Sequence, residues 1–333
     1  MEPRHNTETL MPCPGKVIGW AAIILGAALA PGVHAQDFPT KRVTLVVANA
    51  PGGGSDLMAR LLAQKLQEIW GQPVVLEYKP GAGMVVGTNY VAKSAADGYT
   101  IGQVAMPHVI NPSVRPNMPF DTVKDLSGVT MNTISHVAIV ANPALEANTL
   151  AELIALAKKL PGKLSYATAG AGSSMHLTGE LLKINAGIDM VHIPYKGAGP
   201  AFPDVMAGRV QIMIDPLHSS MSYLKSGKLK PIAIASPRRA AIAPNIPAVA
   251  EHLPGFSVLS INGTVVPSAT PRAIVNKINA AFVATVQAPE IRARMAELGL
   301  EPVGNSPEQF DAFIRTELEK WAKVVKAAGI TAD

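Results

Sequence analysis

The sequence predicts an α/β protein of two lobes, each a mainly parallel sheet flanked by helices, with a ligand cleft at the hinge. Short apolar runs rich in β-branched residues alternate with helical runs along most of the chain. Glycine-rich turns separate several of these strands from the helices that follow. Roughly ten expected strands exceed the usual width of one open sheet, so we expect two sheets.

The first 35 residues have the features of a secretory signal peptide. Lys16 precedes an apolar stretch over residues 17–30, and Val33 and Ala35 satisfy the small-residue rule for cleavage. The apolar stretch is short for a membrane span, although a retained anchor is the alternative. We therefore expect cleavage after Ala35 and a periplasmic mature protein.

The expected strands follow one another with helices between them. They cover residues 43–48, 74–78, 100–105, 128–131, 137–141, 164–167, 190–193, 210–214, 229–235 and 256–266. Two helix starts are marked by their caps. Thr149 with Glu152 forms a capping box, and Ser306 precedes a proline at the first helical position, Pro307.

The series of strands has two natural breaks, near residues 136–142 and near residues 255–266. We expect lobe 1 to comprise residues 36–135 together with 258–333, and lobe 2 to comprise residues 136–257. Two crossing segments of this kind would form a hinge.

Composition excludes several classes of function. The net charge of +5 comes without a basic cluster, so we expect no nucleic-acid partner. The single cysteine, Cys13, lies in the signal region, which leaves the mature chain without a disulfide or a thiol nucleophile. There is no P-loop, nucleophile elbow or H-E-x-x-H motif, and the histidines are scattered. We expect no cofactor and no metal.

Four glycine-rich turns stand between a strand and a helix. Backbone N–H groups at a helix N-terminus bind anions, and such turns gather at the carboxyl ends of parallel strands. They predict a cleft walled by backbone amides, although each alone could be a tight turn. The candidate ligand-binding residues in these turns are Asn49, Ala50, Gly52, Gly53, Ser55 and Asp56; Gly81, Ala82, Gly83 and Met84; Thr168, Ala169, Gly172, Ser173, Ser174 and His176; and Lys196 and Gly197.

Three further candidates, Met106, His108 and Asp215, lie at other strand ends. Asp215 would either cap the next helix or face an amine or hydroxyl of a ligand. The same choice between a structural and a ligand role stays open elsewhere. It concerns Asp56, the hydroxyls of Ser55, Ser173 and Ser174, and the ring of His176.

Several stretches, in order along the chain, form a specific set. They are FPTKRVTLVVANAPGGGSDLMARLLAQKL, GQPVVLEYKPGAGMVVGTNYVAKSAADGYT, PGKLSYATAGAGSSMHLTGELL, MVHIPYKGAGPAFPDVMAGRVQIMIDP, GTVVPSATP and LGLEPVGNSPEQFDAFIRTELEKWAKVVKAAGI. In this set the chain resembles the Bug-type solute-binding proteins of tripartite tricarboxylate transporters. The resemblance covers essentially all of the expected mature chain.

The resemblance implies a two-lobed periplasmic-binding-protein fold of the type II kind, without enzymatic activity. Such proteins capture a small carboxylate by lobe closure and deliver it to membrane permease subunits. The carboxylate, whether a di- or tricarboxylate, an amino acid or an aromatic acid, is held mainly by backbone N–H groups, hydroxyls and waters. We expect a monomer. The alternatives are a sensor subunit that feeds a membrane signalling protein and a periplasmic hydrolase that uses Ser173 and His176.

The chain departs from the family pattern at candidate cleft positions. Asn49 and Ala50 replace a proline- or phenylalanine-rich stretch, and Met84 stands where a glycine is common. Residues 260–263 read Ser-Ile-Asn-Gly, and Pro216 follows the aspartate. These differences put the identity of the ligand in doubt. The side chains of Met84, Met106 and His108 suggest the hypothesis of a larger or aromatic acid.

Overall fold

The computed structural model describes residues 1–3, 38–52, 54–195 and 197–330. The contacts divide the chain into Met1–Asp37 and Phe38–Asp333, and the description below concerns the second unit. The expected signal peptide and its cleavage site after Ala35 lie outside the described residues. In the described part of the chain, no helix combines the length and apolar character needed to cross a bilayer.

Strands and helices alternate as expected. The strands are β1 Val43–Val47, β2 Val74–Tyr78, β3 Thr100–Ala105, β4 Leu126–Ala141, β5 Ser165–Thr168, β6 Val191–Pro194, β7 Ile212–Pro216, β8 Lys230–Ile234, β9 Leu259–Pro267 and β10 Leu300–Pro302. The helices are α1 Gly54–Trp70, α2 Val85–Ala92, α3 Pro107–Val114, α4 Leu150–Lys159, α5 Ser174–Ala186, α6 Ala201–Met206, α7 Leu217–Lys225, α8 Arg272–Gln287, α9 Pro289–Glu297 and α10 Pro307–Ala328, with a 3₁₀ turn η1 at Val249–Glu251.

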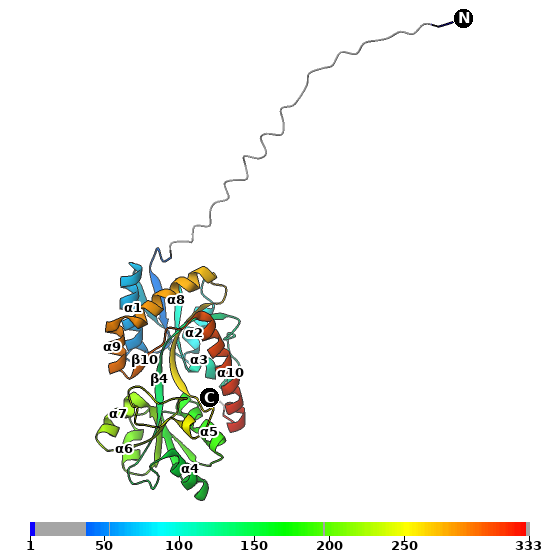
Figure 1. Ribbon diagram of the computed structural model, residues 1–333. Coiled ribbons are helices and arrows are strands. Elements are labelled where there is room, and N and C mark those ends of the chain that lie inside the picture. Colours follow the sequence, from blue (N-terminus) through cyan, green and yellow to red (C-terminus); the bar gives the residue numbers. More distant parts are fainter. Residues whose placement is uncertain (4–37, 53, 196, 331–333) are drawn as a thin grey trace. The chain divides into compact units, whose positions relative to one another are not determined.

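The strands are ordered β2-β1-β3-β9-β4-β7-β5-β6, and β10 and β8 also pair with β4. Strands β2, β1 and β3 are parallel to one another, as are β6, β5 and β7. Every antiparallel pair among the described strands involves β4 or β9. The α/β fold is confirmed, with three parallel strands in each half and antiparallel pairs made by β4 and β9. Figure 1 shows β4 running from the group of elements around α1 and α8 to the group around α4 and α6.

Strand β4 is longer than the sequence indicates, because one strand replaces the two expected at residues 128–131 and 137–141. The polar residues between them are held by neighbouring strands. The amide nitrogen of Asn132 donates to the side-chain oxygens of Asn262 and Thr264 at 3.0 and 2.9 Å. Such bonds compensate the burial of polar groups, so the strand continues where its apolar pattern stops.

The partners of β4 change at one point along its length. Up to His136 it pairs with β9 and β10, and from Val137 onward it pairs with β7 and β8. A second change lies near the start of β9. Val258 donates to the carbonyl of Ala235, and Leu259 then pairs with His136. The two strand groups are thus joined through adjacent stretches of chain.

Both predicted N-cap residues are confirmed, but the capping box expected at Thr149 is incomplete, because Glu152 Oε2 accepts from the backbone N–H of Asn148 at 2.7 Å. The Thr149 hydroxyl accepts from the backbone N–H of Glu152 at 3.2 Å, and the Ser306 hydroxyl accepts from that of Gln309 at 3.3 Å. Strand β10 was not predicted, since three residues carry no recognisable period.

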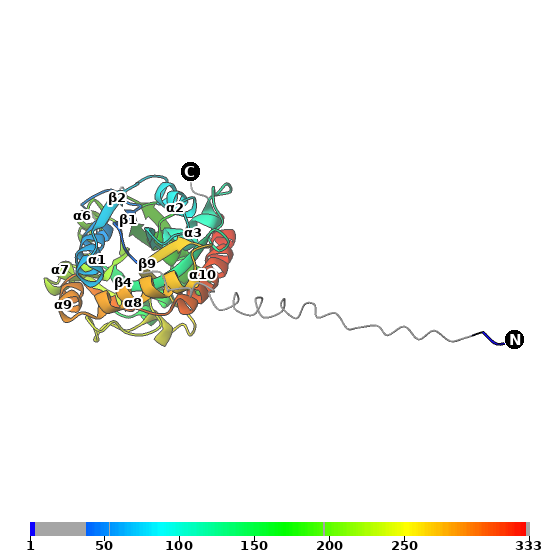
Figure 2. The same ribbon diagram turned by 90° about the horizontal axis from the view of Figure 1, so that it is seen from above.

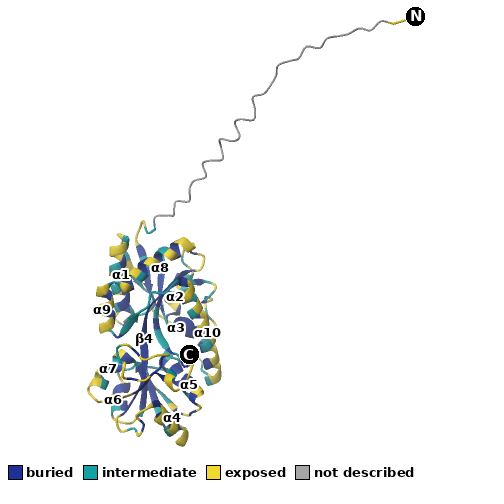
Figure 3. Cartoon of the chain, viewed as in Figure 1, coloured by how far each residue is buried: buried dark blue, intermediate teal, exposed yellow. Residues whose placement is uncertain are grey.

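Helices cover the strands on the outside of the fold (Figure 2). The strands are largely buried, whereas the outer surfaces of the helices are exposed (Figure 3). Helix α10 carries Phe310 and Trp321, both fully buried, into the core. Because the strands within each group are parallel, the turns after β1, β2 and β3 share one edge, and those after β5, β6 and β7 share another.

Candidate ligand-binding site

The turn between β1 and α1 is held by its own side chains. The Asn49 amide nitrogen donates to the Ser55 hydroxyl at 3.0 Å, and the backbone N–H of Gly52 donates to Asp56 Oδ2 at 2.8 Å. Ala50 and Gly52 are exposed at the surface of the turn. A short turn folded in this way presents its remaining backbone amides beside the start of a helix, where an anion is favoured.

Asp56 has a structural role in this turn. Its side chain is buried, and Oδ1 accepts from the Tyr78 hydroxyl at 2.6 Å and pairs with Arg60 Nε at 2.9 Å. The bonds from Tyr78 and Gly52 and the charge of Arg60 lower the pKa of Asp56. Asp56 thus has a structural role from inside the first turn of α1 and does not occupy its N-cap position, and a direct ligand contact stays a prediction.

The turn between β2 and α2 has an unusual backbone. Gly81, Ala82, Gly83 and Met84 all have positive φ, with 46° at Ala82 and 77° at Met84. L-residues other than glycine rarely adopt this conformation, and strain of this kind collects at ligand-binding sites. The amide of Asn111 holds the turn by donating to the carbonyl of Gly83 at 2.8 Å. Met84 therefore occupies a backbone position that favours glycine.

The side chains of Met84, Met106 and His108 are all buried, at 5%, 2% and 4% exposure. Neither ring nitrogen of His108 has a hydrogen-bond partner within the described chain. Burial lowers the pKa of His108 to about 4, so the ring is neutral at pH 7. None of the three lines the cavity described below.

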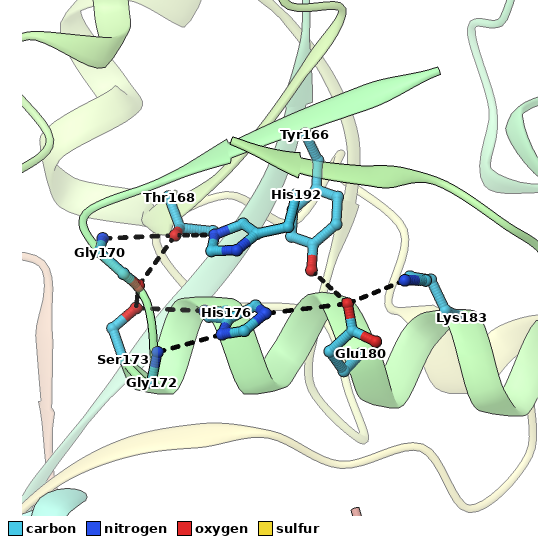
Figure 4. Close-up of polar contacts among 9 residues, drawn as sticks. All are labelled: Tyr166, Thr168, Gly170, Gly172, Ser173, His176, Glu180, Lys183 and His192. Atoms are coloured by element: carbon cyan, nitrogen blue, oxygen red, sulfur yellow. Dashed lines mark hydrogen bonds and ion pairs between the residues drawn. The ribbon is translucent and has the colours of Figure 1, made fainter. Parts of the chain in front are cut away.

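The turn between β5 and α5 is the most extensively bonded of the candidates (Figure 4). The Ser173 hydroxyl donates to the Gly170 carbonyl at 2.7 Å and accepts from the backbone N–H of His176 at 3.2 Å. Gly172 donates its backbone N–H to His176 Nδ1 at 3.1 Å. Ser173 is thus the N-cap of α5, and His176 secures the turn that precedes it.

Two histidine rings stack behind this turn, as Figure 4 shows. The rings of His176 and His192 are 3.7 Å apart between centroids and inclined by 10°. His192 Nε2 lies 2.7 Å from the Thr168 hydroxyl, and the Tyr166 hydroxyl donates to Glu180 Oε1 at 2.6 Å. Burial lowers the pKa of both histidines, that of His192 to about 4 with a contribution from His176. The stack is therefore neutral at pH 7.

The hydrolase alternative is wrong. It required the Ser173 hydroxyl to bond the imidazole of His176, but that hydroxyl bonds the backbone of His176 and the ring accepts from Gly172. Among the described residues, the Ser173 hydroxyl bonds no side chain that could act as a base, so it lacks the activation that nucleophilic catalysis needs.

The turn between β6 and α6 lies beside the turn that contains Thr168 and Ala169. Tyr195 donates its backbone N–H to the carbonyl of Thr168 at 3.0 Å, and Gly197 donates to that of Ala169 at 3.1 Å. Ala169 and Ser174 are partly exposed. The structure thus brings together the predicted residues of these two turns. Gly53 and Lys196 lie outside the described residues.

Asp215 is the penultimate residue of β7 and is buried, with 1% of its surface exposed. Oδ2 accepts from the Ser220 hydroxyl at 3.1 Å, whereas Oδ1 has no partner within the described residues. Burial raises the pKa of Asp215 to about 7, against the opposing effect of Ser220 and Ser219. The side chain can therefore carry a proton near neutral pH and either donate or accept a hydrogen bond.

A cavity of about 220 Å³ lies next to three of these strand ends. Ser55 at the start of α1, Ala105 at the end of β3 and His218 at the start of α7 all line it. The other lining residues are Leu57, Met58, Thr133, Ser135, Ser260, Ile261, Asn262, Leu298 and Leu300. Among the predicted ligand-binding residues, Ser55 is shared with this cavity.

Sequence reasoning missed most of the cavity lining. Leu57 and Met58 read as ordinary core positions of a helix, and Thr133 fell into a gap between two expected strands. Leu298 and Leu300 lie on either side of the unpredicted turn between α9 and β10. The Ser-Ile-Asn-Gly departure at residues 260–263 was the one signal that pointed here. Within the ranges that the structure describes, no group of three or more His, Cys, Asp or Glu side chains is placed to hold a metal ion.

The two strand groups joined through β4, with glycine turns at the carboxyl ends of their parallel strands, define the class of two-lobed periplasmic binding proteins. The chain belongs to the tripartite tricarboxylate transporter receptor family, whose family model matches residues 58–330. Protein BugT of Bordetella pertussis is 35% identical over 92% of this chain and 95% of its own length.

Solved structures agree with this assignment. The periplasmic binding protein BugD is 32% identical with a TM-score of 0.71, covering 89% of this chain and 100% of its own. An R. palustris protein solved with adipate is 33% identical with a TM-score of 0.73, covering 88% of this chain and 99% of its own. The family and these neighbours are solute-binding proteins, which confirms the expectation that the chain is not an enzyme.

Proposed function

We propose that this protein captures a small carboxylate in the periplasm by lobe closure and delivers it to the permease subunits of a tripartite tricarboxylate transporter. The observation that carries the proposal is the set of glycine turns at the carboxyl ends of parallel strands in both strand groups. Family membership supports it, as does the adipate bound by the R. palustris relative.

The proposed binding mode uses backbone amides and hydroxyls. One carboxylate of the ligand docks on the turn from Asn49 to Asp56, beside the N-terminus of α1. The turns at Gly81–Met84, at Thr168–His176 and at Lys196–Gly197 form further walls, with Met106, His108 and Asp215 at neighbouring strand ends. Hydrogen bonds of this kind strengthen when closure excludes water.

The proposed lobes are residues 36–135 with 258–333, and residues 136–257. The change of strand partners between His136 and Val137 supports the first limit. The change between Val258 and Leu259 supports the second. Cleavage of the signal peptide after Ala35 and export to the periplasm are part of the same proposal.

A thermal-shift screen of the purified protein against mono-, di- and tricarboxylates and aromatic acids tests the proposal. A ligand at about 100 times its dissociation constant adds about 2.7 kcal/mol of stability. We expect a rise of several degrees in the melting temperature for one class of acid, and recovery of that acid unchanged by mass spectrometry. Absence of a shift with every acid, after any ligand carried through purification has been removed by unfolding and refolding, would overturn the proposal.

Delivery to a transporter and signalling through a membrane sensor require different partners. Uptake of the identified acid by cells with and without the gene separates them. Loss of uptake in the deletion strain supports delivery, whereas unchanged uptake with an altered transcriptional response supports the sensor alternative.

A further inference from the structure

The cavity beside Ser55 has the size of an organic side group. It measures about 220 Å³. An apolar protein cavity of about 150 Å³ accepts a benzene ring. The space next to the proposed carboxylate site can therefore hold one aromatic ring or a chain of similar volume.

Much of the cavity wall is apolar. Leu57 and Met58 come from α1, Ile261 from β9, and Leu298 and Leu300 from either side of the turn that joins α9 to β10. These side chains belong to three separate parts of the chain. Their convergence favours an apolar body in the ligand, because burying hydrocarbon against hydrocarbon releases water from both.

Among the residues that the structure describes, the cavity lining contains no lysine, arginine, aspartate or glutamate, and His218 is its one titratable side chain. A second or third ionised carboxylate placed here would lose its hydration without gaining an ion pair. This lining disfavours a compact tricarboxylate in the cavity.

Four polar side chains of the lining carry hydrogen-bond donors without partners. Among the described residues, no hydrogen bond is formed by the hydroxyls of Thr133, Ser135 or Ser260. The Asn262 side chain uses its oxygen to accept from Asn132, which leaves its amide nitrogen without an acceptor. These four donors can hold a single oxygen-bearing group at the far end of an apolar body.

We infer that the ligand is a carboxylate with an uncharged apolar body about the size of one aromatic ring. The carboxylate binds at the Asn49–Asp56 turn and the body fills the cavity beyond Ser55. The inference rests on the proposed function and specifies its substrate class. Residues Met58, Leu298 and Leu300 select the body of the ligand.

Calorimetric titration of the purified full-length protein with benzoate, phenylacetate, hexanoate, succinate and citrate tests the inference. We expect at least one of the first three acids to bind at least tenfold more tightly than succinate and citrate. Comparison of the aromatic acids with the aliphatic acid shows whether the body of the preferred ligand is a ring or a chain. Tighter binding of succinate or citrate would overturn the inference while leaving the proposed function in place, and failure of all small carboxylates to bind would overturn both.

The variant Leu298→Trp fills the cavity from one side. We expect it to weaken binding of the preferred acid at least tenfold. Leu160→Trp is the matched control, because Leu160 is also a C-cap residue, at the end of α4, and does not line the cavity. Leu298→Phe is the smaller change if the tryptophan variant does not fold. Unchanged affinity in a folded variant at position 298 would contradict the placement of the ligand body.

Discussion

Asp215 shows how burial changes the chemistry of one carboxyl group. Burial raises its pKa to about 7, from an ordinary value near 4, so the folded state holds this proton more tightly than the unfolded chain does. The stabilising effect of that proton is complete below about pH 4 and is lost as the pH rises towards 7. At pH 8 the buried carboxylate is ionised and lowers the free energy of unfolding.

The variant Asp215→Asn removes this titration. We expect the difference in unfolding free energy between pH 4 and pH 8 to shrink, by at most about 4 kcal/mol at 1.36 kcal/mol per pKa unit. Urea denaturation at the two pH values measures it. The difference between the free energies of unfolding at the two pH values is the quantity to compare. The buried asparagine amide destabilises the variant at pH 4 and pH 8 alike, so its effect cancels in this difference.

Asp204→Asn is the control for this experiment. The Tyr195 hydroxyl and Arg209 lower the pKa of Asp204, so its charge changes mainly below pH 4. In the control, the change in the free energy of unfolding between pH 4 and pH 8 should equal that of the unmodified protein. An unaltered pH profile in Asp215→Asn would show that Asp215 titrates normally in the folded protein.

At the scale of elements, β9 and α10 pack through a glycine. A Cβ atom added at Gly263 would lie 2.3 Å from the ring of Phe310, which is fully buried at the start of α10. The close approach keeps the helix against the strand and closes the core on that side. Only a residue without a side chain allows this distance.

The variant Gly263→Ala should therefore destabilise the protein by about 1 to 3 kcal/mol, the usual cost of overpacking a core. Gly199→Ala is the matched control, since among the described residues no atom beyond its own chain neighbours lies within 4 Å of the place that its new methyl group would occupy, and its φ is not positive. Its effect should stay within about 0.5 kcal/mol. Chemical denaturation of both variants measures these changes in stability. Equal denaturation midpoints for Gly263→Ala and Gly199→Ala would refute the packing argument.

At the scale of the whole molecule, the proposed function requires the two strand groups to move relative to each other. The chain passes between the two groups near His136 and near Val258. A ligand that contacts turns from both groups would favour a closed arrangement through its higher affinity for that state.

Small-angle scattering should therefore show a smaller radius of gyration when the protein is saturated with an acid that raises its melting temperature. An acid that gives no thermal shift is the control and should leave the profile unchanged. An identical profile at saturation would contradict closure without affecting the evidence for binding.

The sequence by itself determined the features that depend on neighbouring residues. The caps at Thr149 and Ser306, the alternation of strands and helices and the glycine turns after β1 and β5 were all predictable, because each is encoded within a few residues. The ordered motifs also identified the family. The candidate ligand-binding residues remain a prediction.

The tertiary structure decided the features that need partners distant in the chain. The continuity of β4 depends on Asn132 meeting Asn262, and the stack of His176 on His192 joins α5 to β6. The cavity beyond Ser55 needs Leu298 and Leu300 from the far end of the sequence. Contacts of this kind leave no period or motif in the sequence, because they arise from the packing of separate elements and not from the local conformation of the backbone.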